Sequence, residues 1–439
     1  MFTIPDVIQS ILEKLIKAGF EAYIVGGCVR DLLLKKEPKD WDITTSAQPE
    51  EILALFPDSF YENKFGTVGV KTDSVIKAWG VVEITTFRTE EKYTDRRHPD
   101  QVVFAKTLKE DLGRRDFTIN ALALDYEFRV VDPFGGQSDL ENKIIKAVGD
   151  PDHRFNEDAL RLMRTVRLAS QLGFEIDEET FQALKKNSGL IRFVSQERIR
   201  DEFMKIITSA RPSLGVELLR ETGILDLIIP ELVEGYGIGQ NKHHIYTVWE
   251  HNLRAMEYGA QEKFSVITIL AALFHDIGKP RTKNGRGANC TFYGHDVVGA
   301  KIGARVMERL KFSKVEIEKV YKLIRWHLFS YTLKEDILGS DMGSEDTEYD
   351  RGVGETTDAA IRRLIRNVGE DNIEDLIKVR ICDRIGSGVP KAVPYRLRHF
   401  QFRVEKILRE KEAISVKMLK VKGEEVMKIL GIPPSPRVG

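Results

Sequence analysis

Two aspartates, Asp40 and Asp42, flank a tryptophan at the start of a predicted strand. Side chains two residues apart on a strand point to the same face, so both carboxylates can reach one group of cations. Hard oxygen ligands favour Mg²⁺, which completes its shell with phosphate oxygens. A third acid, Glu83, lies in the apolar run VVEITTF, where burial would be costly unless a metal lay beside it. By itself the D-x-D spacing also fits a turn with helix-capping acids, with Glu83 facing solvent.

A glycine turn precedes these acids. Gly26 and Gly27 follow the predicted buried strand EAYIV, and VRDLLL then begins a helix with Arg30 near its start. Such a turn presents backbone N–H groups and the positive end of a helix to a phosphate, and an arginine adds a charged fork. The segment lacks the P-loop and dinucleotide fingerprints, and glycine turns after strands are common without a ligand.

Arginines and acids recur together in two later segments. The run Arg114-Arg115-Asp116 opens the apolar segment FTINAL, which fits either binding of a triphosphate and a ribose hydroxyl or a capped helix with a surface ion pair. The segment EDALRLMRTVR has a helical period with an apolar face formed by Ala159, Leu162, Met163, Val166 and Ala169. The opposite arc carries Asp158, Arg161, Arg164 and Arg167, either as solvent-facing salt-bridge partners or as the lining of a cleft for an anion.

A second group of residues suits a different metal. Six of the nine histidines fall between residues 243 and 327. His251 lies in a predicted helix, His275 and Asp276 end the apolar run SVITILAALF, and Asp383 lies in another predicted helix. Imidazoles combined with carboxylates suit Zn²⁺, Mn²⁺, Ni²⁺ or Fe. A His-Asp pair directly after a buried helix needs partners for both groups, which a metal would supply.

The elements that must position these residues change along the chain. Short β-branched runs (WDITT, GTVGVKT, VVEITTFRT and QVVFAKT) mix with helical segments over the first 150 residues, and helix follows helix after Asp150. The predicted fold class is therefore α+β. The glycine-containing acidic stretch 338–356 is the best candidate for an internal flexible segment.

Composition limits the classes of protein that remain. A length of 439 residues predicts about three domains, and three scattered cysteines exclude a disulfide scaffold and fit a reducing cytosol. We find no secretory signal and no apolar stretch near the ~20 residues of a membrane span, so the prediction is a cytoplasmic protein without a membrane partner. Residues 361–420 hold fifteen Lys and Arg residues against eight acids, which fits either a patch for a polyanion or a solvated helical surface.

Four motifs follow one another over residues 26–167: GGxVRD, DxD, RRDFTxNA and EDxxRxxR. This series resembles the class II tRNA nucleotidyltransferases, which are the CCA-adding enzymes and related bacterial poly(A) polymerases. The resemblance implies a polymerase-beta-like palm in which Asp40 and Asp42 hold two Mg²⁺ ions, with Glu83 as a third acid. It implies that the turn at Gly26 and Gly27, with Arg30, takes the triphosphate. The remaining implied nucleotide contacts are Arg115 and Asp116 for phosphate and ribose, and Asp158, Arg161, Arg164 and Arg167 for the base pocket.

The chemistry of the bases agrees with these implied roles. Cytosine and adenine each present an amine donor beside a ring-nitrogen acceptor, so one carboxylate and one guanidinium serve both CTP and ATP. Uracil and guanine present the opposite polarity and would leave charged groups unpaired. Residues 88–99 match the family's flexible loop, which argues for CCA or A addition, although His98 departs from the usual RRP. An A-adding enzyme or a poly(A) polymerase stays an alternative.

The order H…HD…D resembles the HD-domain metal-dependent phosphohydrolases, with His251, His275, Asp276 and Asp383 as the matching ligands. His295 and His327 are candidates for a second ion, and an inactive HD scaffold is the alternative. The predicted domains are a palm (1–140), a helical neck (141–225), an HD domain (226–390) and a basic helical tail (391–439). The tail is predicted to grip the tRNA acceptor arm largely by shape. The competing hypothesis is an HD phosphohydrolase whose N-terminal half binds nucleotide as a regulator, and the oligomeric state stays open.

Overall fold

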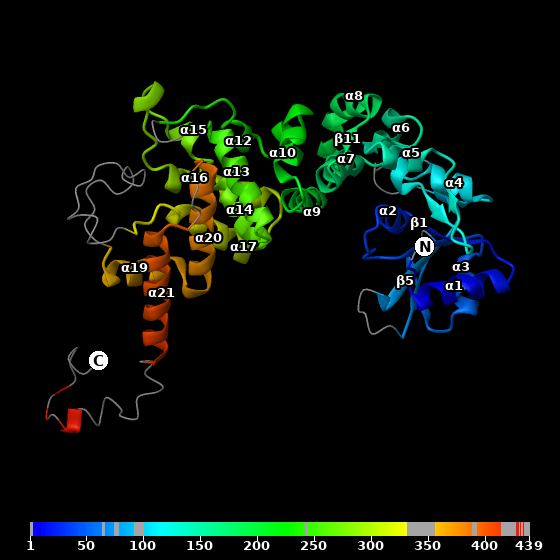
Figure 1. Ribbon diagram of the computed structural model, residues 1–439, viewed down its shortest axis with the longest axis horizontal. Helices are drawn as coiled ribbons and strands as arrows, with labels where there is room; N and C mark the ends of the chain where they lie inside the picture. Colours follow the sequence, from blue (N-terminus) through cyan, green and yellow to red (C-terminus); the bar gives the residue numbers. More distant parts are fainter. Residues whose placement is uncertain are drawn as a thin grey trace. The chain divides into compact units, whose positions relative to one another are not determined.

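The chain forms two compact units, which we describe separately. The computed structural model describes residues 3–63, 66–73, 79–91, 101–241, 245–331, 356–388, 393–413, 427–429, 431 and 433. One unit comprises Met1–Val233 with Arg309–Phe312, and the other comprises Glu234–Glu308 with Ser313–Gly439 (Figure 1). The predicted boundaries at residues 140, 225 and 390 stay predictions. Residues 338–355 of the predicted flexible stretch, and residues 92–99 of the predicted loop, lie outside the described residues.

The first unit is built on a seven-stranded sheet with the order β3-β4-β5-β2-β1-β8-β9. Its neighbours are antiparallel except β2 and β5, which run parallel. A separate hairpin joins β6 (Arg88–Glu91) to β7 (Gln101–Phe104). The strands of the large sheet are β1 (Ala22–Val25), β2 (Asp42–Thr45), β3 (Ser59–Asn63), β4 (Thr67–Lys71), β5 (Val81–Thr86), β8 (Ala123–Leu124) and β9 (Val130–Val131).

The two faces of this sheet differ in character. On one face, Ile24, Ile43, Ile84 and Val68 are fully or almost fully buried, and they pack in one core with helices α1 (Asp6–Lys17) and α3 (Pro49–Leu55). On the other face, Leu108 and Leu112 of α4 (Leu108–Gly113) pack in a smaller core with residues of β1 and β8, and Asp111 of α4 accepts a hydrogen bond from Thr44 of β2. The alternation of side chains along each strand therefore separates an apolar core from the polar residues on the second face.

Helices complete the first unit. Helix α7 buries Leu162, Met163, Val166 and Ala169 completely, as the helical period predicts. Its Arg161 is only 8% exposed, so the solvent-facing interpretation is wrong for this residue. The helices of this part are α2 (Gly27–Leu33), α5 (Gly136–Glu141), α6 (Pro151–Glu157), α7 (Leu160–Leu172), α8 (Glu178–Asn187), α9 (Gln196–Ile207), α10 (Pro212–Glu221), α11 (Ile224–Ile228) and α12 (Pro230–Val233), with the 3₁₀ turns η2 (Thr118–Asn120) and η3 (Ser188–Phe193) and the strand pair β10 (Ile144–Ile145) and β11 (Glu175–Ile176).

The described part of the second unit is helical apart from turns and one isolated bridge. Helix α13 packs against α14 and α20, and a side chain at Gly386 would lie 2.8 Å from the His251 carbonyl oxygen, so glycine permits this close approach. Helix α21 buries Leu397, Phe400 and Val404, so it is part of this unit's packing. The helices are α13 (Val248–Gln261), α14 (Val266–Phe274), α15 (Lys279–Thr282), α16 (His295–Arg309), α17 (Lys314–Trp326), α19 (Asp358–Val368), α20 (Glu370–Gly386) and α21 (Tyr395–Ala413).

The predicted α+β class is confirmed, with strands concentrated in the first part of the chain and helices in the rest. Among the described helices, none has the length and apolar character that a membrane crossing requires.

Candidate active site and candidate metal centre

Three acids meet on the open face of the large sheet. Asp42 begins β2 and stands beside Glu83 of the parallel strand β5. Asp40 lies in the bend just before β2, and Trp41 between the two aspartates is buried in the core. This burial turns both aspartates to the opposite side, where they are exposed. The structure therefore brings the three predicted acids to one place.

The surroundings of Asp42 favour a cation beside it. Solvent reaches Asp42, but the protein packed around its carboxylate removes part of its hydration and raises its pKa; Arg115 opposes that rise, and Asp40 adds to it. A divalent cation would remove this cost because it neutralises the carboxylates directly. The donor set, which consists of carboxylate oxygens only, fits Mg²⁺.

The glycine turn lies directly beside these acids. Gly26 has φ = +84°, and a methyl group there would lie 2.7 Å from Arg115 Nη1 and 3.7 Å from Asp42 Oδ2. Glycine is therefore needed both for the backbone conformation and for the approach of the guanidinium. On the next residue, a side chain at Gly27 would lie 3.5 Å from Arg30 Nη2. The predicted phosphate-binding residues thus gather around the acids.

Asp116 ties the sheet domain to helix α7. Its carboxylate is 7% exposed and accepts hydrogen bonds from the Phe117 N–H (2.9 Å), from the Asn120 amide (3.0 Å) and from Arg164 Nε (2.8 Å). Burial alone would raise the pKa of Asp116, but Arg164 and Asn120 hold it well below its usual value. The same ion pair raises the pKa of Arg164. Both groups therefore stay charged, and the pair fixes the orientation of Arg164.

The remaining predicted pocket residues lie around the start of α7. Arg161 donates to the backbone oxygens of Arg114 (2.9 Å) and Arg154 (3.1 Å) and pairs with Glu157. Asp158 is half-buried and accepts from Arg198 (3.1 Å). Further along the helix, Arg167 pairs with Glu202 of α9 at 3.2 Å.

Sequence reasoning missed the partners that hold these arginines. Glu157 is the last residue of α6 and Arg161 lies in α7, with the extended residue Asp158 between them, so the pair forms across a break between two helices that a helical spacing does not describe. Asn120 also accepts from Arg30 Nη1 (2.8 Å), so it connects the glycine-turn helix to Asp116. No local spacing indicates that contact because Arg30 and Asn120 are 90 residues apart in the chain.

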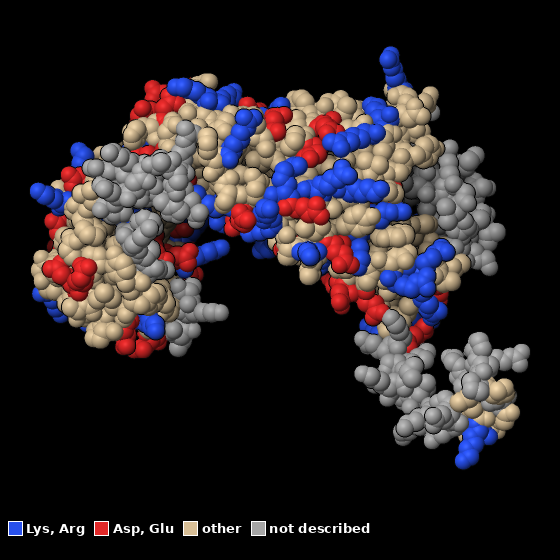
Figure 2. Space-filling view, turned by 180° about the vertical axis from the view of Figure 1, so that it is seen from behind, with Lys and Arg blue, Asp and Glu red and all other residues tan. Residues whose placement is uncertain are grey.

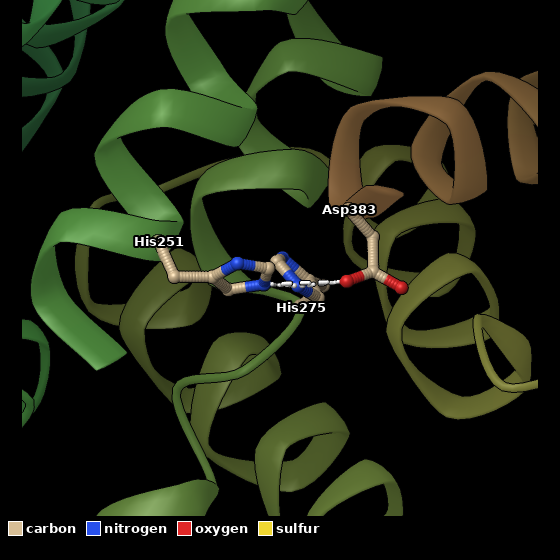
Figure 3. A group of neighbouring side chains, drawn as sticks. All are labelled: His251, His275 and Asp383. Atoms are coloured by element: carbon tan, nitrogen blue, oxygen red, sulfur yellow. Dashed lines mark hydrogen bonds and ion pairs between the residues drawn. The ribbon is translucent and has the colours of Figure 1, made fainter. Parts of the chain in front are cut away.

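The histidine group forms two adjoining clusters in the second unit. One comprises His251, His275 and Asp383, whose side chains point toward one another from three different segments (Figure 3). The other comprises Asp276, His295 and His327, and all six residues are buried. Asp276 Oδ2 lies 3.2 Å from His251 Nε2 and 3.3 Å from His275 Nε2, whereas Oδ1 lies 3.3 Å from His295 Nε2. Asp276 thus stands between the two clusters.

Backbone contacts fix how three of the histidine rings present their nitrogens. The Nδ1 atoms of His275, His295 and His327 each lie 2.7 Å from the carbonyl oxygen three residues earlier. A carbonyl only accepts, so each Nδ1 carries a hydrogen and each neutral ring directs its Nε2 lone pair into the cluster. This second contact is typical of metal-ligating histidines. The donor set of imidazole nitrogens and carboxylate oxygens fits a transition metal.

Burial and the two carboxylates, Asp276 and Asp383, set the pKa values of the histidines in this centre. Burial alone would lower the pKa of His275, but Asp276 and Asp383 raise it to about 10. Burial lowers the pKa of His327 to about 3. Sequence reasoning missed Lys279, which is 2% exposed and places its ammonium 2.6 Å from Asp276 Oδ2. It also missed Arg380, which donates to Asp383 Oδ2 at 2.7 Å.

Three family models match this chain. Residues 22–146 match the poly A polymerase head domain, and residues 173–235 match the probable RNA and SrmB-binding site of polymerase A. Residues 243–386 match the HD domain. One chain therefore combines regions that match a poly A polymerase head domain, an RNA-binding region of polymerase A and an HD domain. The resemblance predicted from the four motifs and from the H…HD…D order is confirmed.

Individual relatives agree with these family-model matches. The CCA-adding enzyme of Geobacillus sp. (strain WCH70) is 48% identical over 223 residues, which are 51% of this chain and 54% of that protein. The CCA-adding enzyme of Lactobacillus helveticus (strain DPC 4571) is 53% identical over 208 residues, or 46% and 51% of the two chains. This chain therefore spans about half the length of the curated relatives it matches.

Among solved structures, the Bacillus stearothermophilus CCA-adding enzyme in complex with CTP resembles this chain with a TM-score of 0.65 and 28% identity. That likeness covers 99% of this chain and 90% of the other. The Thermotoga maritima CCA-adding enzyme complexed with tRNA is 18% identical with a TM-score of 0.58, which supports the fold.

Proposed function

We propose that the protein is a template-independent tRNA nucleotidyltransferase that adds CCA, from CTP and ATP, to the 3′ end of tRNA. The observation that carries the proposal is the meeting of Asp42 and Glu83 on neighbouring parallel strands, with Asp40 and Arg115 beside them. Acids and arginines around one point supply what phosphoryl transfer needs, because that reaction depends mainly on positioning and charge neutralisation. Two relatives that are 48% and 53% identical to about half of this chain are CCA-adding enzymes.

In this proposal, Asp40, Asp42 and Glu83 would hold two Mg²⁺ ions. When bound, these ions lower the pKa of the primer 3′-hydroxyl and neutralise charge on the leaving pyrophosphate. The chain's own cations act on the triphosphate: Arg115 lies over Gly26 beside Asp42, and Arg30 lies beside Gly27. Their guanidinium groups orient the phosphates in line with the attacking hydroxyl.

Selection of the base is assigned to Asp158 and Arg161. A carboxylate that accepts from the exocyclic amine and a guanidinium that donates to the ring nitrogen suit cytosine and adenine alike. Arg161 is oriented by Glu157 and two backbone carbonyls, and Asp158 is oriented by Arg198. These contacts hold both side chains in place, which a protein template requires because a loose pocket would accept any base. Arg164 and Arg167 complete the pocket, fixed by Asp116 and Glu202.

The helical part of the chain would hold the tRNA. Lys and Arg side chains are spread over the helical regions and interspersed with acids (Figure 2). Phosphate contacts from such side chains position an RNA helix by shape, which suits an enzyme that accepts every tRNA. A cytoplasmic location is part of the proposal, and it is supported by the three free and buried cysteines.

The test incubates the purified protein with tRNAs that end before C74, before C75 and before A76, with each nucleoside triphosphate supplied separately. We expect CTP to be added to the first two tRNAs and ATP to the third, after which addition stops. Addition of A only to the last tRNA would identify an A-adding enzyme, and continued A addition would identify a poly(A) polymerase. No addition to any of them would leave the nucleotide-binding half as a regulator.

A second activity is proposed for the HD domain. Six buried ligand side chains form two adjoining clusters with Asp276 between them, and backbone carbonyls fix the tautomers of three histidines; this arrangement favours a two-ion transition-metal site. Such ions polarise a phosphoester and activate water for its hydrolysis when bound. The chain's own Lys279 and Arg380 orient the acidic ligands.

The test of this second activity is the double substitution His275→Ala with Asp276→Ala. We expect loss of bound metal, measured by elemental analysis, and loss of hydrolysis of a nucleoside 2′,3′-cyclic phosphate. Nucleotide addition with Mg²⁺ should persist, because the two sites use different ligands in different units. If the folded variant loses addition as well, the two sites are not separate activities.

A further inference from the structure

One line of cross-strand neighbours crosses the open face of the large sheet through the candidate catalytic acids. Phe60 of β3 stands opposite Gly69 of β4, Gly69 stands opposite Glu83 of β5, and Glu83 stands beside Asp42 of β2. Side chains of directly paired residues share one face of a sheet. The Phe60 ring therefore rises on the same face as the two acids, two strands away from Glu83.

Gly69 lets this ring lie across the sheet toward the acids. A methyl group on Gly69 would lie 2.6 Å from Phe60 Cζ and 3.0 Å from both Cε atoms, so the far end of the ring covers the glycine. Gly69 is absent from the residues with positive φ, so its backbone conformation does not require glycine. Glycine is needed at this position because any side chain would occupy the space of the Phe60 ring. Because neighbouring strands lie ~4.8 Å apart, the ring end reaches to about one strand spacing from Glu83.

The ring is also accessible from outside. Phe60 is 39% exposed, and it is not part of the core that α1 and α3 form on the opposite face of the sheet. Lys71, two residues after Gly69 on the same strand, places its ammonium 5.9 Å from the ring centroid. An exposed aromatic ring beside a cation combines a surface on which a nucleobase can stack with a positive charge that a phosphate can approach.

We propose that Phe60 is the platform on which the 3′-terminal base of the primer RNA stacks, with Lys71 neutralising a phosphate of the same strand end. This inference rests on the proposed nucleotidyl transfer at Asp42 and Glu83. The position suits it, because the terminal ribose must reach the acids while its base extends away over the sheet. Stacking also suits a primer whose last base changes after each addition, since every base has a π-face and none is read by hydrogen bonds.

The test compares Phe60→Ala with Phe60→Trp, and uses Tyr61→Ala as the matched control. Tyr61 is the next residue of β3 and is 45% exposed, but it points to the other face of the sheet. We expect Phe60→Ala to raise the KM for the tRNA primer about 5- to 100-fold, as loss of one stacked base predicts, with the KM for CTP nearly unchanged. Phe60→Trp should restore the primer KM, and Tyr61→Ala should not alter it.

A spectroscopic measurement separates stacking from a structural role. A tRNA acceptor minihelix ending in 2-aminopurine should lose fluorescence on binding the wild-type protein and the Phe60→Trp variant, and should lose markedly less on binding Phe60→Ala. Equal quenching by Phe60→Ala, or a primer KM that the Ala variant does not change, would overturn the assignment. If Phe60→Ala only lowers the melting temperature and Trp does not rescue it, Phe60 is a packing residue. Absence of any addition by the wild-type protein would instead refute the proposed function.

Discussion

The ion pair between Asp116 and Arg164 gives a prediction whose size follows from the structure. Asp116→Asn keeps the shape of the side chain and the hydrogen bond from the Phe117 N–H, but it removes the charge that faces Arg164. Hydrogen bonds to charged groups contribute about 1.5–3 kcal/mol, and breaking a buried pair costs about 3–5 kcal/mol. Arg164 is 34% exposed and can recover some hydration, so we expect the lower part of this range. The free energy of unfolding should fall by about 2–3 kcal/mol.

Calorimetry of the full chain measures this change as a shift of one unfolding transition. For a unit of this size, about 2–3 kcal/mol corresponds to a melting temperature lower by about 4–12 °C. Asp125→Asn is the matched control, because it removes the same charge from an ion pair with Arg129, which is 70% exposed. Exposed pairs contribute about 0–1 kcal/mol, so the control should shift the transition much less.

The pH dependence of the same variant has a definite sign. Asp116 has a lower pKa in the folded protein than in the unfolded chain, so its stabilisation is fully present above the unfolded value of ~3.9. It is lost as the pH falls through the folded pKa. The gap between wild type and Asp116→Asn should therefore stay constant from about pH 5 to 8 and narrow below about pH 4. An unchanged melting temperature at pH 7, or a gap that widens in acid, would refute the reasoning.

Three further predictions concern the turn, the base pocket and the RNA-binding surface. Gly26→Ala should lower the steady-state rate of nucleotide addition more than Gly19→Ala does. Both positions have positive φ, but only a methyl group at Gly26 would displace Arg115. Equal losses of rate in the two variants would mean that backbone strain alone matters. Replacing Asp158 with Asn, or Arg161 with Ala, should admit UTP or GTP while primer binding, measured by fluorescence anisotropy, stays near normal; unchanged selectivity would place base recognition elsewhere. The triple change Arg398→Gln, Lys406→Gln and Arg409→Gln on exposed positions of α21 should weaken tRNA binding. The slope of log binding constant against log salt concentration should become shallower by about 0.7–0.9 for each lost phosphate contact. An unchanged slope would mean that α21 does not contact the RNA.

The sequence predicted the local part of the candidate catalytic site well. Alternation around Trp41 places Asp40 and Asp42 on one face, and the glycine turn follows its strand as expected. The sequence could not show that β5 lies parallel to β2 with Glu83 beside Asp42. That register is set by long-range sheet order and packing, and a local pattern carries no information on it. The roles assigned to these residues stay predictions until they are tested.

Burial of charged residues was harder to predict than their spacing. The helical period put Arg161 on a polar arc, yet backbone carbonyls of two other segments and Glu157 surround its guanidinium. A helical wheel assigns every residue outside the apolar face to solvent, so it cannot show that other segments of the chain pack against the polar side of the helix. Lys279 was missed for a related reason, since a lysine three residues after Asp276 becomes a buried partner only when the HD helices assemble.

The platform at Phe60 was beyond the reach of sequence patterns. Nothing in the separation of Phe60 from Gly69 indicates that a ring on one strand covers a glycine on the next. The pairing depends on an antiparallel register with an irregularity between Tyr61 and Asn63. Such irregularities re-aim side chains in ways that alternation alone does not predict.

The most direct test of the central claim is nucleotide addition by Asp42→Asn. The substitution keeps the size of the side chain and removes the carboxylate that stands between Glu83 and Arg115, and Asp58→Asn, an exposed acid just before β3, is the control. We predict that addition of CTP to a tRNA lacking its CCA end falls at least about 1,000-fold in the folded variant, because several kcal/mol of metal-dependent charge stabilisation is lost. The control should act like wild type. Addition by folded Asp42→Asn at the wild-type rate would contradict the assignment of this sheet face as the site of nucleotidyl transfer.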